Sequence, residues 1–330
     1  MRAIRIIQYG LGPIGSRVTK FLAEKPWARI VAGIDIDPAK AGRDVGVLAG
    51  LKPVGARVSA DATAVLRRKA DVAVITTASS LVKLAPQVLA CVATGKNVVT
   101  TCEELSYPWL TRPALARRID RAARARGVAV LATGVNPGFL MDFLPLALTG
   151  VCREVRHVTV ERIQDAQFRR LPFQQKIGAG LSLREFARKK RGGTLRHVGL
   201  TESMHMLAAA FGWKLDRTED LITPIVAIKR TVTGAMTVSR GHAAGVAQTG
   251  RGWIRDREVI RLVFRAAVGE PGPRDRIVID ADPPIHSTIR GGVNGDTATC
   301  AITVNAIPAI LKAAPGLRTM LDIAPVTCRI

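Results

Sequence analysis

Up to about residue 132, short apolar runs alternate with amphipathic stretches, a pattern typical of strands and helices that follow one another in turn. The apolar run Ile4–Tyr9 leads into an amphipathic stretch, about Ile14–Glu24, and then into a second apolar run, Ile30–Asp35. The alternation continues with a short helix near Thr63–Lys69, strand Ala73–Thr76, helix Leu84–Thr94, strand Asn97–Thr101, helix Arg112–Arg126 and strand Val128–Ala132. Short apolar strands separated by helices predict an α/β fold with a doubly wound parallel sheet.

Beyond Gly150 the segments become longer and alternate between apolar and polar positions, which favours β-strands. The predicted strands are Val155–Ile163, Ile225–Thr233, Thr237–Ala247, Arg257–Val268 and Arg274–Asp280, with helices near Leu183–Arg191 and Thr201–Phe211. Strands with helices set apart from them indicate an α+β second domain. A last helix, Asp296–Leu311, is rich in small residues suited to close packing. We therefore expect domains at 1–150 and 151–295, and a C-terminal segment, 296–330, that packs back on the first domain.

Three glycines mark the turn between the first strand and the first helix. Gly10, Gly12 and Gly15 have the spacing G-x-G-x-x-G. In such a turn the first glycine permits the tight bend, the second lets the backbone approach a pyrophosphate, and the third lets helix and strand pack closely. The free N–H groups of the helix then face the phosphates. This spacing also occurs in flexible loops, but the strand before it and the helix after it favour a Rossmann-type dinucleotide site.

An acid at the end of the second strand bears on which cofactor binds. Asp35 lies about twenty residues after the glycines, where a carboxylate accepts hydrogen bonds from an adenosine ribose and opposes a 2′-phosphate. Lys40 and Arg43 follow closely and offer that phosphate a partner. We expect NAD or NADP, with NAD slightly favoured and dual use plausible. The expected cofactor-binding residues are Gly10, Gly12, Pro13, Ile14, Gly15, Asp35, Asp37, Thr77, Ala78, Ser79, Thr101, Cys102, Asn136 and Pro137.

The chain of 330 residues has a formal net charge of +23, a balance that also occurs in nucleic-acid-binding proteins. Here the basic residues are spread along the chain, and an aromatic content of 4% leaves few platforms for stacking bases. We expect mostly solvated surface charge and no specific nucleic-acid partner. A dinucleotide-sensing or nucleic-acid-associated regulator remains the alternative from another functional class.

Composition also bears on the expected localisation, oligomeric state and metal content of the protein. A hydrophobic content of 48% can fill two domain cores, and no apolar run approaches the roughly twenty residues that cross a bilayer. We expect a cytoplasmic protein without a membrane partner, and a homodimer because a β-rich second domain commonly builds a dimer face. The five cysteines lack the spacing of zinc ligands, so neither a disulfide framework nor a metal site is expected.

Ligands of open parallel sheets bind beyond the carboxyl ends of the strands, so the loops there hold the candidate chemistry. Three loops qualify, namely Thr77–Ser80, Cys102–Glu104 and Thr133–Phe139, and we expect them to converge on the nicotinamide. Asn136 is placed to fix the carboxamide or a substrate amine, and Gly138 allows the backbone to approach the ring. Ordinary turn chemistry accounts for the small residues of the first loop equally well.

Glu103 and Glu104 are the candidate catalytic residues. In extended chain, consecutive residues face opposite ways, so one of the two is expected to face the cleft. A carboxylate beside the nicotinamide suits a cationic amine or iminium, and it can activate the water that hydrolyses an imine. The alternative is that both acids simply precede a helix and interact with its macrodipole.

Five stretches together carry a resemblance to a known family, and they are Gly10–Gly15, Asn97–Pro108, Thr133–Phe139, His197–Ser203 and Gly295–Thr299. They resemble 2,4-diaminopentanoate dehydrogenases and the related native amine dehydrogenases, a branch of the dihydrodipicolinate reductase-like fold. The Cys-Glu-Glu and Asn-Pro-Gly-Phe blocks are more specific than the glycine spacing. The resemblance implies reversible oxidative deamination, in which amine, NAD(P)⁺ and water give a ketone or aldehyde, ammonia and NAD(P)H.

The resemblance also implies roles for particular residues. It places the catalytic glutamate at Glu103 or Glu104, and it places the substrate pocket at Phe139, Met141, Arg162 and His197. Without the resemblance, Phe139 and Met141 are interpreted as core residues and His197 as a hydrogen-bonded structural residue.

The stretches 164–170 and 189–191 are unusually basic for a pocket that receives a diamine, because their positive charges would repel the cationic diamine. A neutral-tailed aliphatic or cyclic ketone and its amine are easier to accommodate. A dihydrodipicolinate reductase-type imine reductase, whose acidic substrate the basic loop suits, is the alternative within the same fold.

Overall fold

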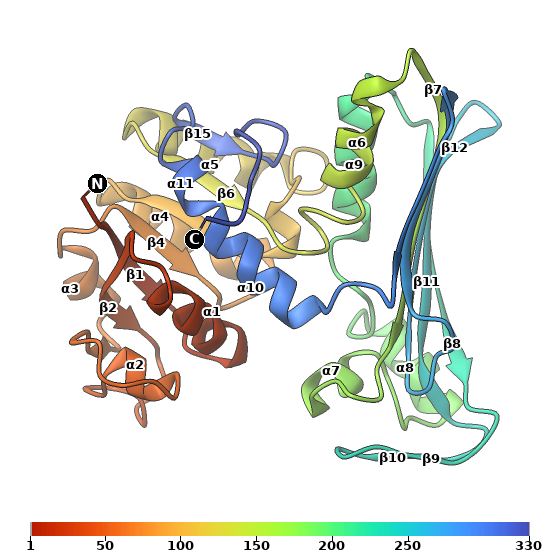
Figure 1. Cartoon of the computed structure of the whole chain (residues 1–330), viewed down its shortest axis with the longest axis horizontal. Coiled ribbons are helices and arrows are strands. Elements are labelled where there is room, and N and C mark those ends of the chain that lie inside the picture. The colour runs from red at the N-terminus through yellow and green to blue at the C-terminus, as the bar shows by residue number, and fades with distance from the viewer. Residues whose placement is uncertain (1, 330) are drawn as a thin grey trace. The chain divides into compact units, whose positions relative to one another are not determined.

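The computed structural model describes residues 2–329 and divides the chain into two compact units (Figure 1). Unit 1 comprises the residues up to Phe139 together with those from Asn294 onward, and unit 2 comprises Leu140–Val293. The division falls before the boundary near 150 expected from the sequence. Residues just after Phe139 are tied into unit 2, because the Asp142 carboxylate accepts a hydrogen bond from Ser203 Oγ at 2.7 Å.

Unit 1 contains a seven-stranded parallel sheet in the order β15-β6-β5-β4-β1-β2-β3. Its strands are β1 (Ile4–Tyr9), β2 (Ala28–Ile34), β3 (Val58–Ser59), β4 (Val72–Ile75), β5 (Asn97–Thr100), β6 (Ala129–Ala132) and β15 (Gly316–Arg318). Every residue of β4 and β6 is buried, as expected for short strands covered on both faces. The doubly wound Rossmann-type sheet predicted from the sequence is confirmed.

The helices of unit 1 are α1 (Pro13–Ala23), α2 (Val45–Leu48), α3 (Ala62–Leu66), α4 (Leu81–Ala93), η1 (Glu103–Leu105), α5 (Pro113–Ala125), α10 (Gly295–Asn305) and α11 (Ile307–Ile310). The single helix predicted over 296–311 is wrong at its middle, since α10 ends at Asn305 and α11 starts anew with Pro308 in its first turn. Proline is favourable in a first turn and breaks a helix interior. The C-terminal part belongs to unit 1, where α10 packs against α1 and β15 pairs with β6.

Unit 2 contains a six-stranded mixed sheet in the order β14-β13-β7-β12-β11-β8. Its elements are α6 (Phe143–Leu148), η2 (Thr149–Val151), β7 (Glu154–Asp165), α7 (Leu171–Lys176), α8 (Leu183–Arg191), α9 (Leu200–Ala210), β8 (Arg217–Val226), β9 (Thr231–Val232), β10 (Thr237–Val238), β11 (Ala243–Ile254), β12 (Arg257–Ala267), β13 (Arg274–Asp282) and β14 (Ile285–Arg290). Strands β7 and β12 run parallel, and the other neighbours run antiparallel. Figure 1 shows α6, α7 and α9 on one side of this sheet, so the α+β expectation is confirmed.

Two strands of unit 2 were predicted in the wrong place. The expected strands Ile225–Thr233 and Thr237–Ala247 are replaced by β8, which ends at Val226, and β11, which begins only at Ala243. The expected strand ends at Ala247, whereas β11 continues through Gly250 and Gly252. A Cβ on Gly252 would lie 2.9 Å from a Leu215 methyl, so close packing requires glycine inside this strand.

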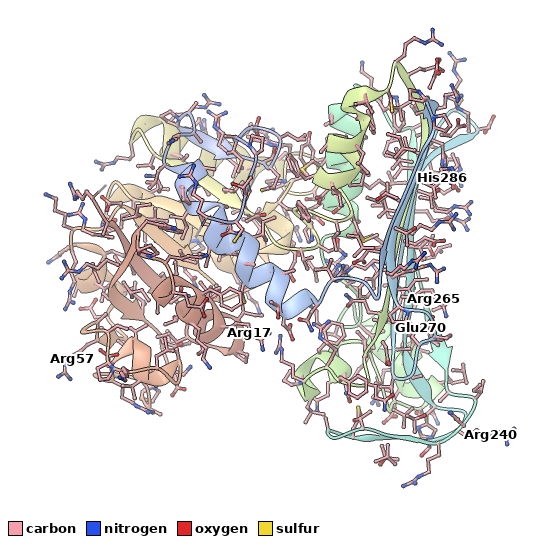
Figure 2. All side chains as sticks on the ribbon, in the orientation of Figure 1. Arg17, Arg57, Arg240, Arg265, Glu270 and His286 are labelled. Carbon is pink, nitrogen blue, oxygen red and sulfur yellow. The ribbon has the colours of Figure 1, made fainter. Side chains whose placement is uncertain are left out.

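The excess positive charge lies on the surface of both units. Figure 2 shows Arg57 in unit 1 and Arg240 in unit 2 pointing outward from their ribbons. No helix among residues 2–329 combines the length and the apolar character needed to span a membrane.

Candidate functional site

The glycine turn after β1 has the shape that a dinucleotide needs. Gly10 has φ +91°, and a Cβ there would lie 2.8 Å from Thr77 Cγ2. A Cβ on Gly15 would collide with the carbonyl oxygen of Gly10. A Cβ on Gly12 would meet nothing within 4 Å, so there is open space at the N-terminus of α1, which begins at Pro13. This crowded turn beneath an open helix end fits a pyrophosphate.

Asp35 follows β2 and is held in place by three donors. Its carboxylate accepts hydrogen bonds from the backbone N–H of Leu11 at 2.7 Å and of Asp37 at 3.0 Å, and from Lys40 Nζ at 3.1 Å. Burial of Asp35 works to raise its pKa, but these donors outweigh burial, so the pKa lies below its ordinary value. Lys40 also contacts the Asp37 carboxylate at 3.4 Å. The Asp35 carboxylate, which is suited to bind an adenosine ribose, is therefore ionised and has the Lys40 ammonium group beside it.

The loops after β4 and β5 are tied to each other. The carbonyl oxygen of Ser79 accepts hydrogen bonds from Cys102 Sγ at 3.1 Å and from the backbone N–H of Glu104 at 3.3 Å. Burial raises the pKa of the Cys102 thiol, which keeps this thiol protonated and unreactive. In the loop after β4, Thr77 Oγ1 donates to Gln87 Oε1 at 2.6 Å.

The two adjacent glutamates have different surroundings. They do not lie in extended chain as predicted, because residues 103–105 form the 3₁₀ turn η1. Glu104 is buried, and its Oε2 accepts a hydrogen bond at 2.8 Å from the backbone N–H of Leu81, the first residue of α4. Glu103 instead lines a small cavity. The helix-start role that the sequence left open thus describes Glu104, while Glu103 has access to a cavity.

This cavity, called the Glu103 cavity below, has a volume of about 40 Å³. It is lined by Thr101, Cys102, Glu103, Ser106, Thr133, Gly134, Asn136, Pro137 and Thr299. The loop after β6 folds tightly at its edge, because Gly138 has φ +115° and a Cβ there would lie 2.6 Å from the Gly134 nitrogen. The cavity and the glycine turn both lie beyond the carboxyl ends of strands of the same parallel sheet.

Sequence reasoning found only part of this lining. It named Thr101, Cys102, Glu103, Asn136 and Pro137 and missed three hydroxyl side chains. The missed hydroxyls belong to Ser106, Thr133 and Thr299. All three occur in the stretches that carry the family resemblance, which was the one available signal, since threonine and serine have no distinctive spacing.

In unit 2 the structure brings Arg162 and His197 together. His197 stacks on Phe264, with ring centroids 4.3 Å apart, and Phe264 on β12 pairs with Arg162 on β7. Burial, with the charges of Lys176 and Arg162, lowers the pKa of His197 to about 3. The imidazole is therefore neutral, and its buried Nε2 has no hydrogen-bond partner among residues 2–329.

Arg162 is almost fully buried and binds two groups, which also bind each other. Its guanidinium contacts Asp275 Oδ1 at 2.8 Å and donates to the carbonyl oxygen of Val293 at 2.9 Å, while Asp275 Oδ2 accepts from the Val293 N–H at 2.7 Å. Burial lowers the pKa of Arg162 and raises that of Asp275, so for each group lost hydration outweighs the attraction of its partner.

Of the other residues that the resemblance assigned to the substrate pocket, Met141 is fully buried in unit 2 and Phe139 is half-buried at the end of unit 1. Within residues 2–329, no group of three histidine, cysteine or acidic side chains is placed to hold a metal ion.

Two family models match the chain, one in its C-terminal part and one in its N-terminal part. Residues 139–330 match the 2,4-diaminopentanoate dehydrogenase C-terminal domain, and residues 4–103 match the N-terminus of dihydrodipicolinate reductase.

Individual relatives agree along the whole length. The chain is 32% identical to 2,4-diaminopentanoate dehydrogenase of Acetoanaerobium sticklandii, covering 98% of this chain and 94% of the relative. It is 26% identical to an amine dehydrogenase of Streptomyces virginiae, covering 97% and 96%. Among solved structures, the amine dehydrogenase from Mycobacterium smegmatis superposes with a TM-score of 0.88 at 27% identity, covering 99% of this chain and 97% of that one.

Proposed function

Because the chain belongs to the 2,4-diaminopentanoate dehydrogenase family, we propose that it interconverts a small amine and the matching ketone or aldehyde as an NAD(P)-dependent amine dehydrogenase. In the oxidative direction the amine, NAD(P)⁺ and water give the carbonyl compound, ammonium and NAD(P)H. The observation that carries this proposal is the cavity lined by Glu103 at the sheet edge that also bears the glycine turn.

The residues of unit 1 fit a dinucleotide. The open N-terminus of α1 above Gly12 would bind the pyrophosphate, and Asp35 would accept hydrogen bonds from a ribose. When bound, the nicotinamide supplies the acceptor or donor of a hydride.

Glu103 is the residue that we assign to proton transfer. In the direction of amination, its carboxylate takes one proton from ammonium. The ammonia nitrogen then forms a bond to the carbonyl carbon as the carbonyl π bond breaks, and a proton passes from that nitrogen to the carbonyl oxygen. The resulting carbinolamine receives that proton back on its hydroxyl group, which leaves as water. The restored carboxylate stabilises the iminium cation that remains. The amine nitrogen and one carboxylate therefore account for every proton moved before reduction.

We propose that both NAD and NADP are used and that NAD is slightly preferred. The ionised Asp35 disfavours a 2′-phosphate, whereas Lys40, 3.1 Å from that carboxylate, partly neutralises it. These two neighbours have opposite effects on the same phosphate, which reduces discrimination between the cofactors.

We propose a substrate with a neutral tail. Lys176 and Arg162 both act on His197, one of the pocket residues implied by the resemblance, and their charges disfavour its protonation. The same cations would repel a second ammonium group on the substrate. The match of residues 139–330 also favours amine dehydrogenation over the dihydrodipicolinate reductase-type alternative, whose match covers residues 4–103 only. A cytoplasmic homodimer stays a prediction.

A screen of ketones and aldehydes with ammonium chloride, following loss of NADH and of NADPH in parallel, tests the function. We expect oxidation of the reduced cofactor only when both a carbonyl compound and ammonium are present. Equal oxidation without ammonium would contradict the proposal. Turnover confined to a cyclic imine dicarboxylate would support the imine reductase alternative instead.

A further inference from the structure

The Glu103 cavity is too small for the carbon skeleton of a substrate. One water-sized molecule needs about 10–15 Å³ of such volume, and the cavity offers about 40 Å³. It therefore has room for a few non-hydrogen atoms at most. A ligand of this cavity is a small polar molecule rather than a ketone.

One hydroxyl in the lining is buried without a hydrogen-bond partner. Thr133 is 3% exposed, and its Oγ1 has no partner among residues 2–329. Two other hydroxyls of the lining are already engaged, since Ser106 Oγ donates to the Glu103 carbonyl oxygen at 2.8 Å and Thr299 Oγ1 accepts from the Val135 N–H at 3.3 Å. Buried polar atoms are rarely left without a partner, so Thr133 Oγ1 indicates a ligand in the cavity.

The lining includes Glu103, which bears a carboxylate, and four residues whose hydroxyl oxygens can accept hydrogen bonds, namely Thr101, Ser106, Thr133 and Thr299. Ammonium has four N–H donors and a positive charge, and ammonia has three donors, so both complement this lining. Water fits the volume equally well, but it has only two donors and no charge to match Glu103.

We propose that the Glu103 cavity is the site that holds ammonium before amination, with the Glu103 carboxylate and the Thr133 hydroxyl accepting its N–H groups. This inference rests on the proposed amine dehydrogenase function and assigns the nitrogen donor its own site in unit 1. Thr133 acts as a positioning residue that holds the nitrogen beside Glu103.

The test replaces the hydroxyl while keeping the shape of the side chain. For Thr133→Val we expect the KM for ammonium to rise about tenfold, the effect of one hydrogen bond to a charged ligand, with the KM for the carbonyl compound and kcat within twofold of the unmodified protein. Thr133→Ser retains the hydroxyl and should restore the ammonium KM.

Thr319→Val is the matched control. Thr319 is also in unit 1 and 3% exposed, but its Oγ1 already donates to Asp322 Oδ2 at 2.7 Å. Its replacement should lower the thermal midpoint and leave the ammonium KM unchanged.

Different results overturn different statements. Normal turnover of Thr133→Val with an unchanged ammonium KM would overturn the ammonium site and leave the enzyme function standing. The same holds if Thr319→Val raises the ammonium KM equally, or if Thr133→Val raises the carbonyl KM as much as the ammonium KM. If the unmodified protein shows no ammonium-dependent turnover with any carbonyl compound, the proposed function and the ammonium site both fail.

Discussion

The two units bury charged side chains in different ways. In unit 1 each buried charge binds backbone, as Lys96 Nζ does at 2.6 Å from the Leu66 carbonyl and Glu104 does at the start of α4. In unit 2 the buried Arg162 and Asp275 bind each other across the sheet, and the buried Glu270 contacts the partly exposed Arg265, five residues before it, at 2.7 Å (Figure 2). Charge therefore fixes loop and helix ends in unit 1, and in unit 2 it also joins side chains of neighbouring strands.

The sharpest test of this comparison uses two neighbouring acids of unit 1. Glu103→Gln should lower kcat for amination by about 10²–10⁴-fold, the usual effect of losing a proton-transfer group. Its unfolding free energy should change little, because the side chain lines a cavity. Steady-state rates and the dissociation constant for NADH separate this loss from weakened cofactor binding, which should stay close to that of the unmodified protein.

Glu104→Gln is the matched control. It keeps an oxygen acceptor for Leu81 but loses the negative charge at the N-terminus of α4, so we expect a loss of about 1 kcal/mol in unfolding free energy and nearly normal kcat. If Glu104→Gln rather than Glu103→Gln abolished turnover, the assignment of the two residues would be reversed.

The second prediction concerns the charge pair of unit 2. Asp275→Leu leaves the buried Arg162 without its carboxylate, so we expect the unfolding free energy to fall by about 3–5 kcal/mol in urea titrations. The double variant Arg162→Met with Asp275→Leu removes both charges and should recover most of that loss. If the double variant were as unstable as the single one, loss of packing rather than an uncompensated charge would explain the result.

A smaller, pH-dependent effect is expected from His197. Its pKa in the folded state is about 3, below the ordinary value, so between about pH 6.5 and pH 3 the unfolded chain binds a proton that the folded chain does not. His197 therefore does not oppose folding above pH 6.5. Below this pH its effect lowers the unfolding free energy by about 1 kcal/mol per pH unit. His197→Phe keeps the ring on Phe264 and should flatten the dependence of the urea midpoint on pH between about 6.5 and 5.

The control for this effect is His286→Phe, because His286 is exposed on β14, as Figure 2 shows. This variant should retain the pH dependence of the unmodified protein. An identical slope in His197→Phe would mean that other groups cause the acid sensitivity.

The sequence predicts unit 1 better than unit 2, for a physical reason. Strands such as β4 and β6 are apolar throughout and lie between helices with clear periodicity, so each element is visible locally. Strand β11 contains Gly245, Gly250 and Gly252, whose role depends on neighbours elsewhere in unit 2. The sequence alone does not show those neighbours, so it does not give the bounds of this strand.

The site was predictable to the level of the loop but not of the side chain. The order of strands places the loops after β5 and β6 at one edge, as expected. The 3₁₀ turn η1 determines which glutamate lines the cavity, and no sequence pattern predicts this single turn. Thr299 joins Thr133 only because α10 returns to unit 1 after the whole of unit 2.

That return has a consequence for synthesis on the ribosome. β15, the outermost strand beside β6, is translated after all the residues of unit 2, so β6 stays an open sheet edge while Leu140–Val293 emerges. Unpaired edges invite association with other chains, and domains form from the N-terminus as translation proceeds. The nascent Rossmann sheet is thus most prone to aggregation during the interval before its last strand is made.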